Sequence, residues 1–496
     1  MQAWLRRGFT CSSDFSGCRG WESAIEELTF GLLKFGFEVP DGCWYWHSFS
    51  DIKAESRQVA VAGRRRAGSL AGPDFMVGPM HVFGNVVRRF PREIQRELHE
   101  ACPTESAAKE DALLQHLECR AIMDKDLSSY RPQSAFCDVH MRQCNPRPPE
   151  ERQQLGQRQR CRFATASTVC AGFSSRGSSS GLAHGSSLSA HAWASERYFA
   201  HDDIVLHENH SRSRGLLQGL LGDRDYLVIE VALSPYHFGF PFAKDRIYSC
   251  ALSRSTVEWF GPPPAEAQQH IIQLFGRKVA ASGDIYFNAS REALAKEANA
   301  RRPPHTPEFT AEDVCFVCVC VCFWFFRRDK HALFLVCEDV RAGIDWKSLL
   351  APCYQSIWDK YMGMIRGDAN LASMPLHFDC HQNPSHGTLS PEIRSFTGHS
   401  DICSALRERF VCCSELLQIH GLHPDSPVGK RFAELPISVQ HSTAGNGVHL
   451  AVVGFFLAWV LAFSRPVASA DSAGGGGSAS AASASGGADL SDPLAG

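Results

Sequence analysis

The stretch Phe15-Ser16-Gly17-Cys18-Arg19-Gly20 decides how this chain folds, because its two glycines form a tight turn directly before a helical pattern. From Trp21 to Phe35, apolar residues recur at helical spacing. Glycine lets the backbone approach a ligand closely, and amides at a helix N-terminus favour polar or anionic groups. A strand, a glycine turn and a helix, in this order, open a nucleotide-type binding unit of the α/β class. An acid at the end of the next strand would bind ribose hydroxyls in such a unit, and Asp51 is the candidate.

The composition is that of a globular protein with a large core. The 496 residues are 44% hydrophobic and 10% aromatic, which suits a catalytic domain with a second lobe. The net charge of −3 excludes a global basic field for nucleic acid, although arginine-rich runs occur at 64–66, 88–89 and 147–162. Twenty cysteines are scattered, without the spacing of a disulfide framework, and no secretory signal opens the chain. We therefore expect a reducing compartment and mostly buried thiols.

Composition shifts divide the chain into four parts. Residues 1–260 predict an α/β core with an insertion at about 95–162, and short apolar runs alternate with turns from 163 to 260. Residues 261–400, which begin with three prolines, predict a loop-rich lobe. Residues 401–465 return to helical and apolar patterns that complete the core. The segment 466–496 is mostly Ala, Ser and Gly, which predicts a disordered tail.

Two apolar stretches, 314–326 and 448–463, are short of the usual membrane span, and we predict a buried helix or strand for each. Within the first, four cysteines alternate with apolar residues at 315–322. This pattern is equally compatible with a buried strand and with an intron translated in error. No membrane partner is predicted.

A candidate nucleophile and the other candidate catalytic residues lie next to successive apolar runs along the chain. Cys170 follows the apolar run 165–169 and precedes a turn, which places it at a carboxyl strand edge, where ligands bind in open α/β sheets. The strand 204–206 would deliver Glu208 to the same edge as a proton donor or acceptor. Lys244 and Arg246 precede another strand, and Arg246 would supply fixed donors for a base carbonyl or phosphate. The simpler interpretation of the basic pair is an ion pair with Asp245.

The ordered set of motifs resembles cytosine-carbon-5 DNA methyltransferases, most of all divergent eukaryotic members. The 15–20 turn resembles F-x-G-x-G-G, with Arg19 replacing a glycine, and 169–174 resembles Pro-Cys-Gln-x-Phe-Ser, with Val169 and Ala171 replacing Pro and Gln. The other matches are 84–86, 207–210, 242–246 (with Phe242 and Lys244 replacing Gln and Arg of Q-x-R-x-R), 409–421 and 444–448. The resemblance covers about 10–260 and 400–463, so that 265–400 lies at the position of the family's target-recognition domain.

The resemblance implies a class I S-adenosylmethionine-dependent methyltransferase fold, Rossmann-like with a mixed sheet, and a small irregular target-recognition lobe. It implies that S-adenosylmethionine binds at Phe15, Ser16, Gly17, Gly20, Asp51, Asn85 and Asn446. It also implies that Cys170, Glu208, Arg246 and Lys244 are catalytic. The Cys170 thiolate would add to carbon 6 of a flipped cytosine, Glu208 would hold ring nitrogen 3 and the exocyclic amine, and the basic pair would steady the base carbonyl and the nucleophile loop.

The implied function is methyl transfer to carbon 5 of cytosine in DNA, and the implied location is the nucleus. Two alternatives stay open: a catalytically impaired relative that binds nucleic acid or another partner, and the same chemistry on RNA, since the catalytic set does not encode the sugar. We predict no metal site, because the one combination considered for zinc, two cysteines at 315 and 318 with histidines at 381 and 386, lacks compact spacing.

Overall fold

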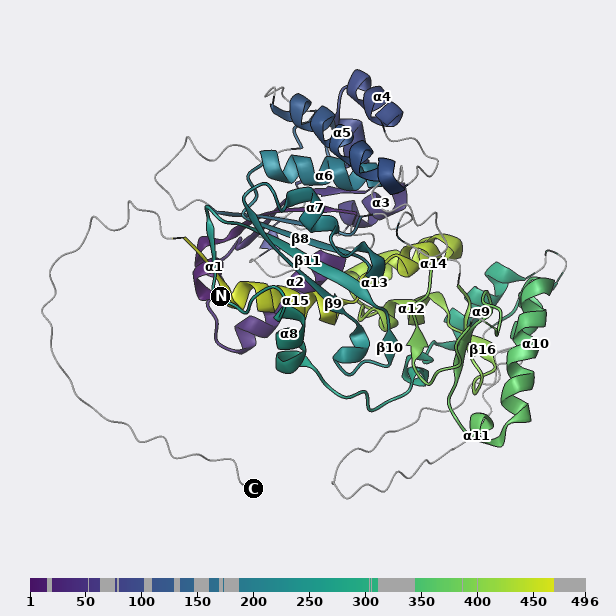
Figure 1. Ribbon diagram of the computed structural model, residues 1–496. Coiled ribbons are helices and arrows are strands. Elements are labelled where there is room, and N and C mark those ends of the chain that lie inside the picture. The colour runs from purple at the N-terminus through teal and green to yellow at the C-terminus, as the bar shows by residue number, and fades with distance from the viewer. Residues whose placement is uncertain are drawn as a thin grey trace, which may run out of the picture.

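The fold is built on one large mixed sheet, which the computed structural model shows with helices on both faces and a smaller lobe to one side (Figure 1). The structure describes residues 1–15, 20–51, 53–62, 76–77, 80–101, 109–128, 134–146, 160–168, 173, 187–302, 304, 306–310, 344–385, 387–398 and 400–467. The predicted residues Ser16, Gly17 and Cys170, the cysteine-rich segment 315–322 and the tail from 468 lie outside these ranges.

Among the described residues, ten strands form this sheet in the order β6-β5-β4-β2-β1-β7-β8-β11-β9, with β3 paired to β2. Their bounds are β1 Phe9–Asp14, β2 Trp44–Ser50, β3 Met76–Val77, β4 His81–Phe83, β5 Ala135–Cys137, β6 Arg142–Cys144, β7 Cys161–Ala166, β8 Ile204–His210, β9 Tyr226–Leu233 and β11 Arg246–Ser253. Strands β4, β2, β1, β7 and β8 are parallel, whereas β11 lies antiparallel between β8 and β9.

This topology confirms the predicted fold class. The order of the parallel strands reverses beside β1. The last strand of this sheet along the chain, β11, lies antiparallel between β8 and β9. A parallel sheet with that reversal and that inserted strand has the class I methyltransferase arrangement. The pair β5–β6 is an addition, since it extends the sheet beyond β4 with two short antiparallel strands. Both strands come from the segment expected to be an insertion.

The central strands are buried on both faces. Every residue of β1 is buried, as expected for a parallel strand covered by helices on each side. Phe9 and Trp44 stack across β1 and β2 with ring centroids 4.1 Å apart. Strand β7 begins and ends several residues earlier than the predicted run 165–169, because Phe163 supplies an apolar contact beneath Phe9.

Two helical layers cover the sheet. On one face lie α1 Gln2–Arg7, α2 Gly20–Lys34, α8 Ala267–Phe275 and α15 Leu450–Ala462. On the other face lie η1 Val86–Arg89, α4 Arg92–Ala101, α5 Lys109–Ser128, α6 Leu188–Phe199 and α7 Leu216–Leu221. Helix α3, Ala54–Ala62, packs at the β4 edge, and the short helices η5 Ser211–Ser213 and η6 Pro235–His237 follow β8 and β9.

The apolar stretch 448–463 forms the core helix α15, as predicted. By length and composition, the helical segment Ile437–Ala462 is one that would cross a membrane, but 72% of its most apolar window is buried inside the protein. Phe456 and Trp459 are fully buried, and α15 packs against α2 and α8 (Figure 1). The apolar surface of α15 is therefore buried in the core of the protein.

The smaller lobe has its own apolar core, which extends from Leu294 to Cys412. Its elements are η7 Gly283–Tyr286, α9 Arg291–Arg301, η8 Trp346–Leu349, α10 Pro352–Gly367, α11 Ala369–Ala372, β13 His377–Asp379, β15 Ile402–Ser404 and β16 Arg409–Phe410. Two small pairings, β10 Phe242–Ala243 with β14 Ile393–Arg394 and β12 Val257–Trp259 with β17 Ser464–Pro466, join distant segments. Helices α12 Cys413–Ile419, α13 Pro427–Ala433 and α14 Ile437–Gly445 lead back to α15.

Candidate active site

The carboxyl ends of five parallel strands lie in one row across the sheet. In the strand register, Asp14 of β1 is opposite Ser50, which is opposite Phe83, and on the other side Asp14 is opposite Ala166, which is opposite His207. Residues that follow these strands therefore lie along one edge of the sheet. That edge is where open α/β sheets bind ligands.

The turn after β1 begins with an unusual backbone conformation at Phe15. Its φ of 58° lies in the left-handed region, and its amide donates to the carbonyl of Ser50 at 2.8 Å. Gly20 begins α2 on the far side of the turn. A Cβ placed on Gly20 would stand 2.3 Å from Cγ2 of Val448. That side of Gly20 is therefore occupied by the segment just after Asn446, which sets the close packing of α2 on the terminal motif.

Asp51 follows β2 and is buried, with an exposed fraction of 6%. Its Oδ1 accepts the Lys53 amide at 2.8 Å, and the Lys53 ammonium donates to the Ser442 hydroxyl at 2.7 Å. Asn446 ends α14 and donates its side-chain amide to the carbonyl of Ser442 at 2.9 Å. Two residues predicted to share a ligand, Asp51 and Asn446, are thus joined through Lys53 and Ser442.

Asn85 follows β4 at the same edge. Its side-chain oxygen accepts the amide of Val87 at 3.0 Å and so caps the short helix η1. Because an amide oxygen has two lone pairs, Asn85 can still accept one further hydrogen bond and can donate from its amide NH₂.

Glu208 and Arg246 form an ion pair across β8 and β11. Arg246 Nε lies 3.2 Å from Glu208 Oε1, and both side chains are mostly buried. Arg246 also donates to the backbone carbonyl of Asp245 at 2.9 Å. The alternative ion pair with the Asp245 side chain is therefore not the arrangement found. Arg246 fixes the orientation of the Glu208 carboxylate at the strand edge.

The neighbours of Glu208 hold the residue that precedes the predicted nucleophile loop. Asn209 donates its side-chain amide to the carbonyl and hydroxyl oxygens of Thr168, at 3.2 and 3.0 Å, and His207 Nε2 lies 2.8 Å from the same hydroxyl. Burial lowers the pKa of His207 to about 3, so its imidazole is neutral. Cys170 itself lies outside the described residues, but Thr168, two positions earlier, is fixed by the strand that carries Glu208.

Lys244 differs from its predicted role. Its ammonium donates to the carbonyls of Gly447 at 2.6 Å and Gly445 at 3.3 Å, which makes it a support for the terminal turn. The sequence placed it beside Arg246 on the substrate, because the two residues share one short segment. The strand geometry separates them, since Arg246 begins β11 whereas Lys244 lies in the link that follows β10.

A buried ion network beneath the strand ends was not predicted. Arg89 lies 2.5 Å from Glu196 and 3.3 Å from Asp14, and it also donates to the Ser50 hydroxyl. Burial opposes the charge of neighbouring Arg197, but the carboxylates around it raise its pKa. Arg89 is only 5% exposed and ties β1, β2 and α6 together. The partners of Arg89 are remote in sequence, so no local sequence pattern predicts this network.

A cleft of about 450 Å³ lies between the smaller lobe and α14. It is lined by Ala300, Arg301, His381, Gly398, Ser400, Asp401, Ile437, Ser438 and His441. Arg301 bridges its two sides, because it contacts Asp401 at 2.6 Å and the ring nitrogen of His441 at 2.8 Å. The lobe and the terminal helices therefore share a polar surface close to the end of α14.

Comparisons with known proteins find only distant similarity. No family model matches this chain, and no curated protein matches it. Among solved structures, the S. pombe Dnmt2 methyltransferase and the Entamoeba histolytica methyltransferase EhMeth each align over 92% of this chain and 98% of their own, at 11% identity and a TM-score of 0.39. A prophage-encoded DNA modification methyltransferase from E. coli aligns over 92% of this chain and its full length, at 10% identity and a TM-score of 0.38. The fold assignment rests on the strand order, because TM-scores below 0.5 do not establish a common fold.

Proposed function

We propose that this protein transfers a methyl group from S-adenosylmethionine to carbon 5 of cytosine in DNA, through a covalent adduct with Cys170. The observation that carries the proposal is the arrangement on β8. On one side of this strand, His207 and Asn209 hold Thr168. Glu208, which lies between them in sequence, presents its carboxylate on the other side, paired with Arg246. A buried carboxylate beside the approach to a thiol loop is what nucleophilic attack on a pyrimidine requires.

The proposed roles are those that the resemblance implies, and these contacts support them. Cys170 is two residues beyond Thr168, and chain geometry limits the separation of their Cα atoms to about 7 Å. The thiolate forms a bond to carbon 6 of a cytosine that has left the base stack. Glu208 holds ring nitrogen 3 and the exocyclic amine, while Arg246 keeps the carboxylate in place. The addition breaks the double bond between carbons 5 and 6, and carbon 5 becomes the nucleophile that would take the methyl group. Transfer of the carbon 5 proton to water then breaks the bond between carbon 6 and sulfur, which releases the thiolate and restores the double bond.

The described residues at the strand edge fit the cofactor. Asp51 is a buried carboxylate at the end of β2, the position that binds ribose hydroxyls in nucleotide-binding sheets, and Asn85 offers an amide donor at the next strand. Phe15, with its left-handed backbone, follows β1 at the same edge, and α2 begins at Gly20. When bound, S-adenosylmethionine supplies a methyl group on a positively charged sulfur. A DNA substrate in a eukaryotic cell corresponds to a nuclear location.

Cofactor binding is the first test. Calorimetric titration with S-adenosylmethionine should show binding by the wild type and by Asp41→Ala, which removes an exposed acid in the turn before β2. Binding should be lost in Asp51→Ala. A folded wild type that binds no cofactor would overturn the enzyme proposal.

Covalent trapping is the second test and separates the alternatives. DNA carrying a mechanism-based cytosine analogue should be trapped by the wild type and by Cys353→Ser, which changes an exposed cysteine in α10, but not by Cys170→Ser. Cofactor and DNA binding without trapping would identify a catalytically impaired relative, in keeping with Val169 and Ala171 in the loop. Trapping on matched RNA but not on DNA would move the same chemistry to an RNA substrate.

A further inference from the structure

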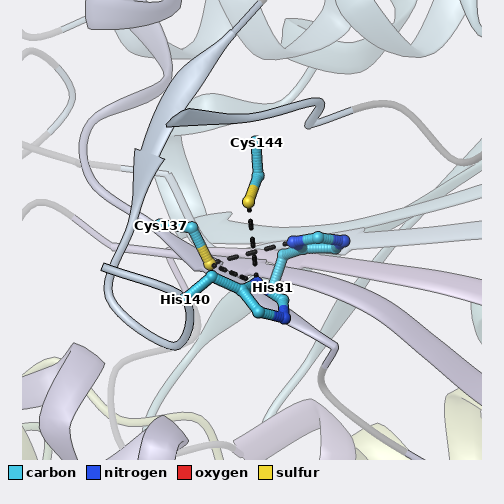
Figure 2. A group of neighbouring side chains, drawn as sticks. All are labelled: His81, Cys137, His140 and Cys144. Atoms are coloured by element: carbon cyan, nitrogen blue, oxygen red, sulfur yellow. Dashed lines mark hydrogen bonds between the residues drawn. The ribbon is translucent and has the colours of Figure 1, made fainter. Parts of the chain in front are cut away.

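The edge hairpin β5–β6 brings together four side chains that commonly bind metals. Cys137 ends β5, His140 lies in the turn, Cys144 ends β6, and His81 begins the neighbouring strand β4. Figure 2 shows the two sulfur atoms and the two rings converging on one another from these elements. The four ligand atoms all lie within 4.8 Å of one another, and Cys137 is fully buried.

The distances match the edges of a tetrahedral metal site. Cys137 Sγ lies 3.5 Å from His140 Nδ1 and 3.8 Å from His81 Nδ1, and Cys144 Sγ lies 3.6 Å from His140 Nδ1. A zinc ion with bonds of about 2.3 Å to sulfur and about 2.05 Å to nitrogen would place tetrahedral sulfur and nitrogen ligands about 3.6 Å apart. The observed separations agree with this value within about 0.2 Å.

The contacts within the cluster converge on one nitrogen. Both cysteines approach Nδ1 of His140, and Cys144 also hydrogen-bonds Cys137 and Arg142. One ring nitrogen either donates a single hydrogen or accepts at a single lone pair. A cation at the centre would give the two sulfur atoms and the two ring nitrogens one common partner, because each of the four atoms then directs a lone pair toward the metal.

We propose that His81, Cys137, His140 and Cys144 bind one structural zinc ion. Two thiolates and two neutral imidazoles give a neutral complex with Zn²⁺, and four protein ligands leave no open position for catalysis. The spacing from Cys137 to His140 to Cys144 is compact, whereas His81 comes from a different strand. The sequence analysis did not bring these four residues together, because only the sheet register places β4 beside the hairpin.

The proposed ion gives the insertion a structural role. Strands β5 and β6 have three residues each, and β5 pairs with β4 at a single register position, Phe83 with Cys137. Short isolated hairpins are marginally stable in water. Beyond the backbone pairing, the hairpin is held by the 2.6 Å ion pair between Arg57 and Asp138. A metal shared by β4 and the hairpin would fasten this edge, beside the strand that carries Asn85.

A second group of possible ligands in the described chain, Glu297, Cys413 and His441, does not support the same proposal. The Arg301 guanidinium lies 2.9 Å from Glu297 and 2.8 Å from His441. A cation is already present there, so a metal would have to displace a buried arginine. In the β4 hairpin group Arg142 hydrogen-bonds Cys144, but Arg142 is exposed on β6, so a metal would displace no buried arginine there.

Metal content of the purified full-length protein tests the proposal. Elemental analysis after reconstitution and desalting should find about one zinc per chain in the wild type and in Cys353→Ser, and little in Cys144→Ser or His140→Asn. Replacing the zinc by Co²⁺ should give a thiolate-to-cobalt absorption band in the wild type that is weakened in Cys144→Ser. A zinc-free wild type, or full retention of zinc by both site variants, would overturn the proposal.

A measurement on the wild type alone guards against variants that fail to fold. Hydrogen exchange followed peptide by peptide, before and after chelation, should show faster exchange in 135–144 and unchanged exchange in β8 and β11. Because a metal that binds only the folded state stabilises it by mass action, chelation should also lower the melting temperature. Exchange and melting that are both insensitive to a strong chelator would contradict a structural ion.

Discussion

Replacing Gly20 by alanine should strain the contact between the first helix of the core and the terminal motif. The added Cβ would lie 2.3 Å from Cγ2 of Val448, more than an ångström inside the ordinary contact distance of about 3.5–4.0 Å. Overpacking of this kind costs about 1–3 kcal/mol, and the better helix propensity of alanine offsets about 0.5–1 kcal/mol. We expect Gly20→Ala to reduce the free energy of unfolding by about 1–2 kcal/mol, measured by urea denaturation.

A double-mutant cycle and a matched control make this reasoning refutable. Gly31 lies in the same helix and has no atom within 4 Å of its would-be Cβ, so Gly31→Ala should stabilise by about 0.5–1 kcal/mol. Val448→Ala removes the clashing methyl groups, and adding it to Gly20→Ala should recover at least about 1 kcal/mol relative to additivity. A Gly20→Ala protein as stable as Gly31→Ala, or strictly additive effects, would show that the two segments do not touch as described.

Three further predictions concern buried ionisable side chains. Arg89→Met should cost about 3–5 kcal/mol in urea unfolding, because Asp14 keeps a buried charge without its partner. Lys244→Met should cost about 2–3 kcal/mol and weaken S-adenosylmethionine binding, because the terminal turn loses its ammonium donor. Burial lowers the pKa of His207 and of His449 to about 3, so the stability that each neutral ring contributes is complete above pH 6.5 and declines as the pH falls from 6.5 toward 3. At pH 5 each should have lost about 2 kcal/mol, as denaturation at pH 8 and pH 5 would reveal.

Control substitutions for Arg89 and Lys244 change exposed residues of the same type. Arg88→Met changes the exposed neighbour of Arg89 and should alter stability by less than about 0.5 kcal/mol, and an equal loss in both variants would refute the network. Lys34→Met, at the end of α2, is the corresponding control for Lys244. His449→Phe should reduce the pH dependence by about one histidine's share. Unfolding free energies that are flat between pH 7 and pH 5 would contradict the neutral buried imidazoles.

Local patterns in the sequence were sufficient for the elements of the core. The glycine turn before Trp21 predicted the change from β1 to α2, and the apolar runs near 204, 226 and 247 predicted β8, β9 and β11. These predictions succeeded because strand and helix periodicity reflect burial of neighbouring residues. The site prediction also relied on order along the chain, since strands that end at one edge carry their next residues to the same place.

Contacts between distant segments could be decided only by the tertiary structure. Lys244 supports the terminal turn, and Arg89 joins three elements, because chain directions and side-chain reach are set by packing across the whole sheet. The histidine and cysteine group at β4 depends on strand register, a long-range property that the polar sequence around Cys144 does not encode locally. The sequence by itself therefore determined which elements of the core form and in what order they follow one another. The tertiary structure decided which side chains meet, because those meetings depend on how the sheet and its two helical layers pack together.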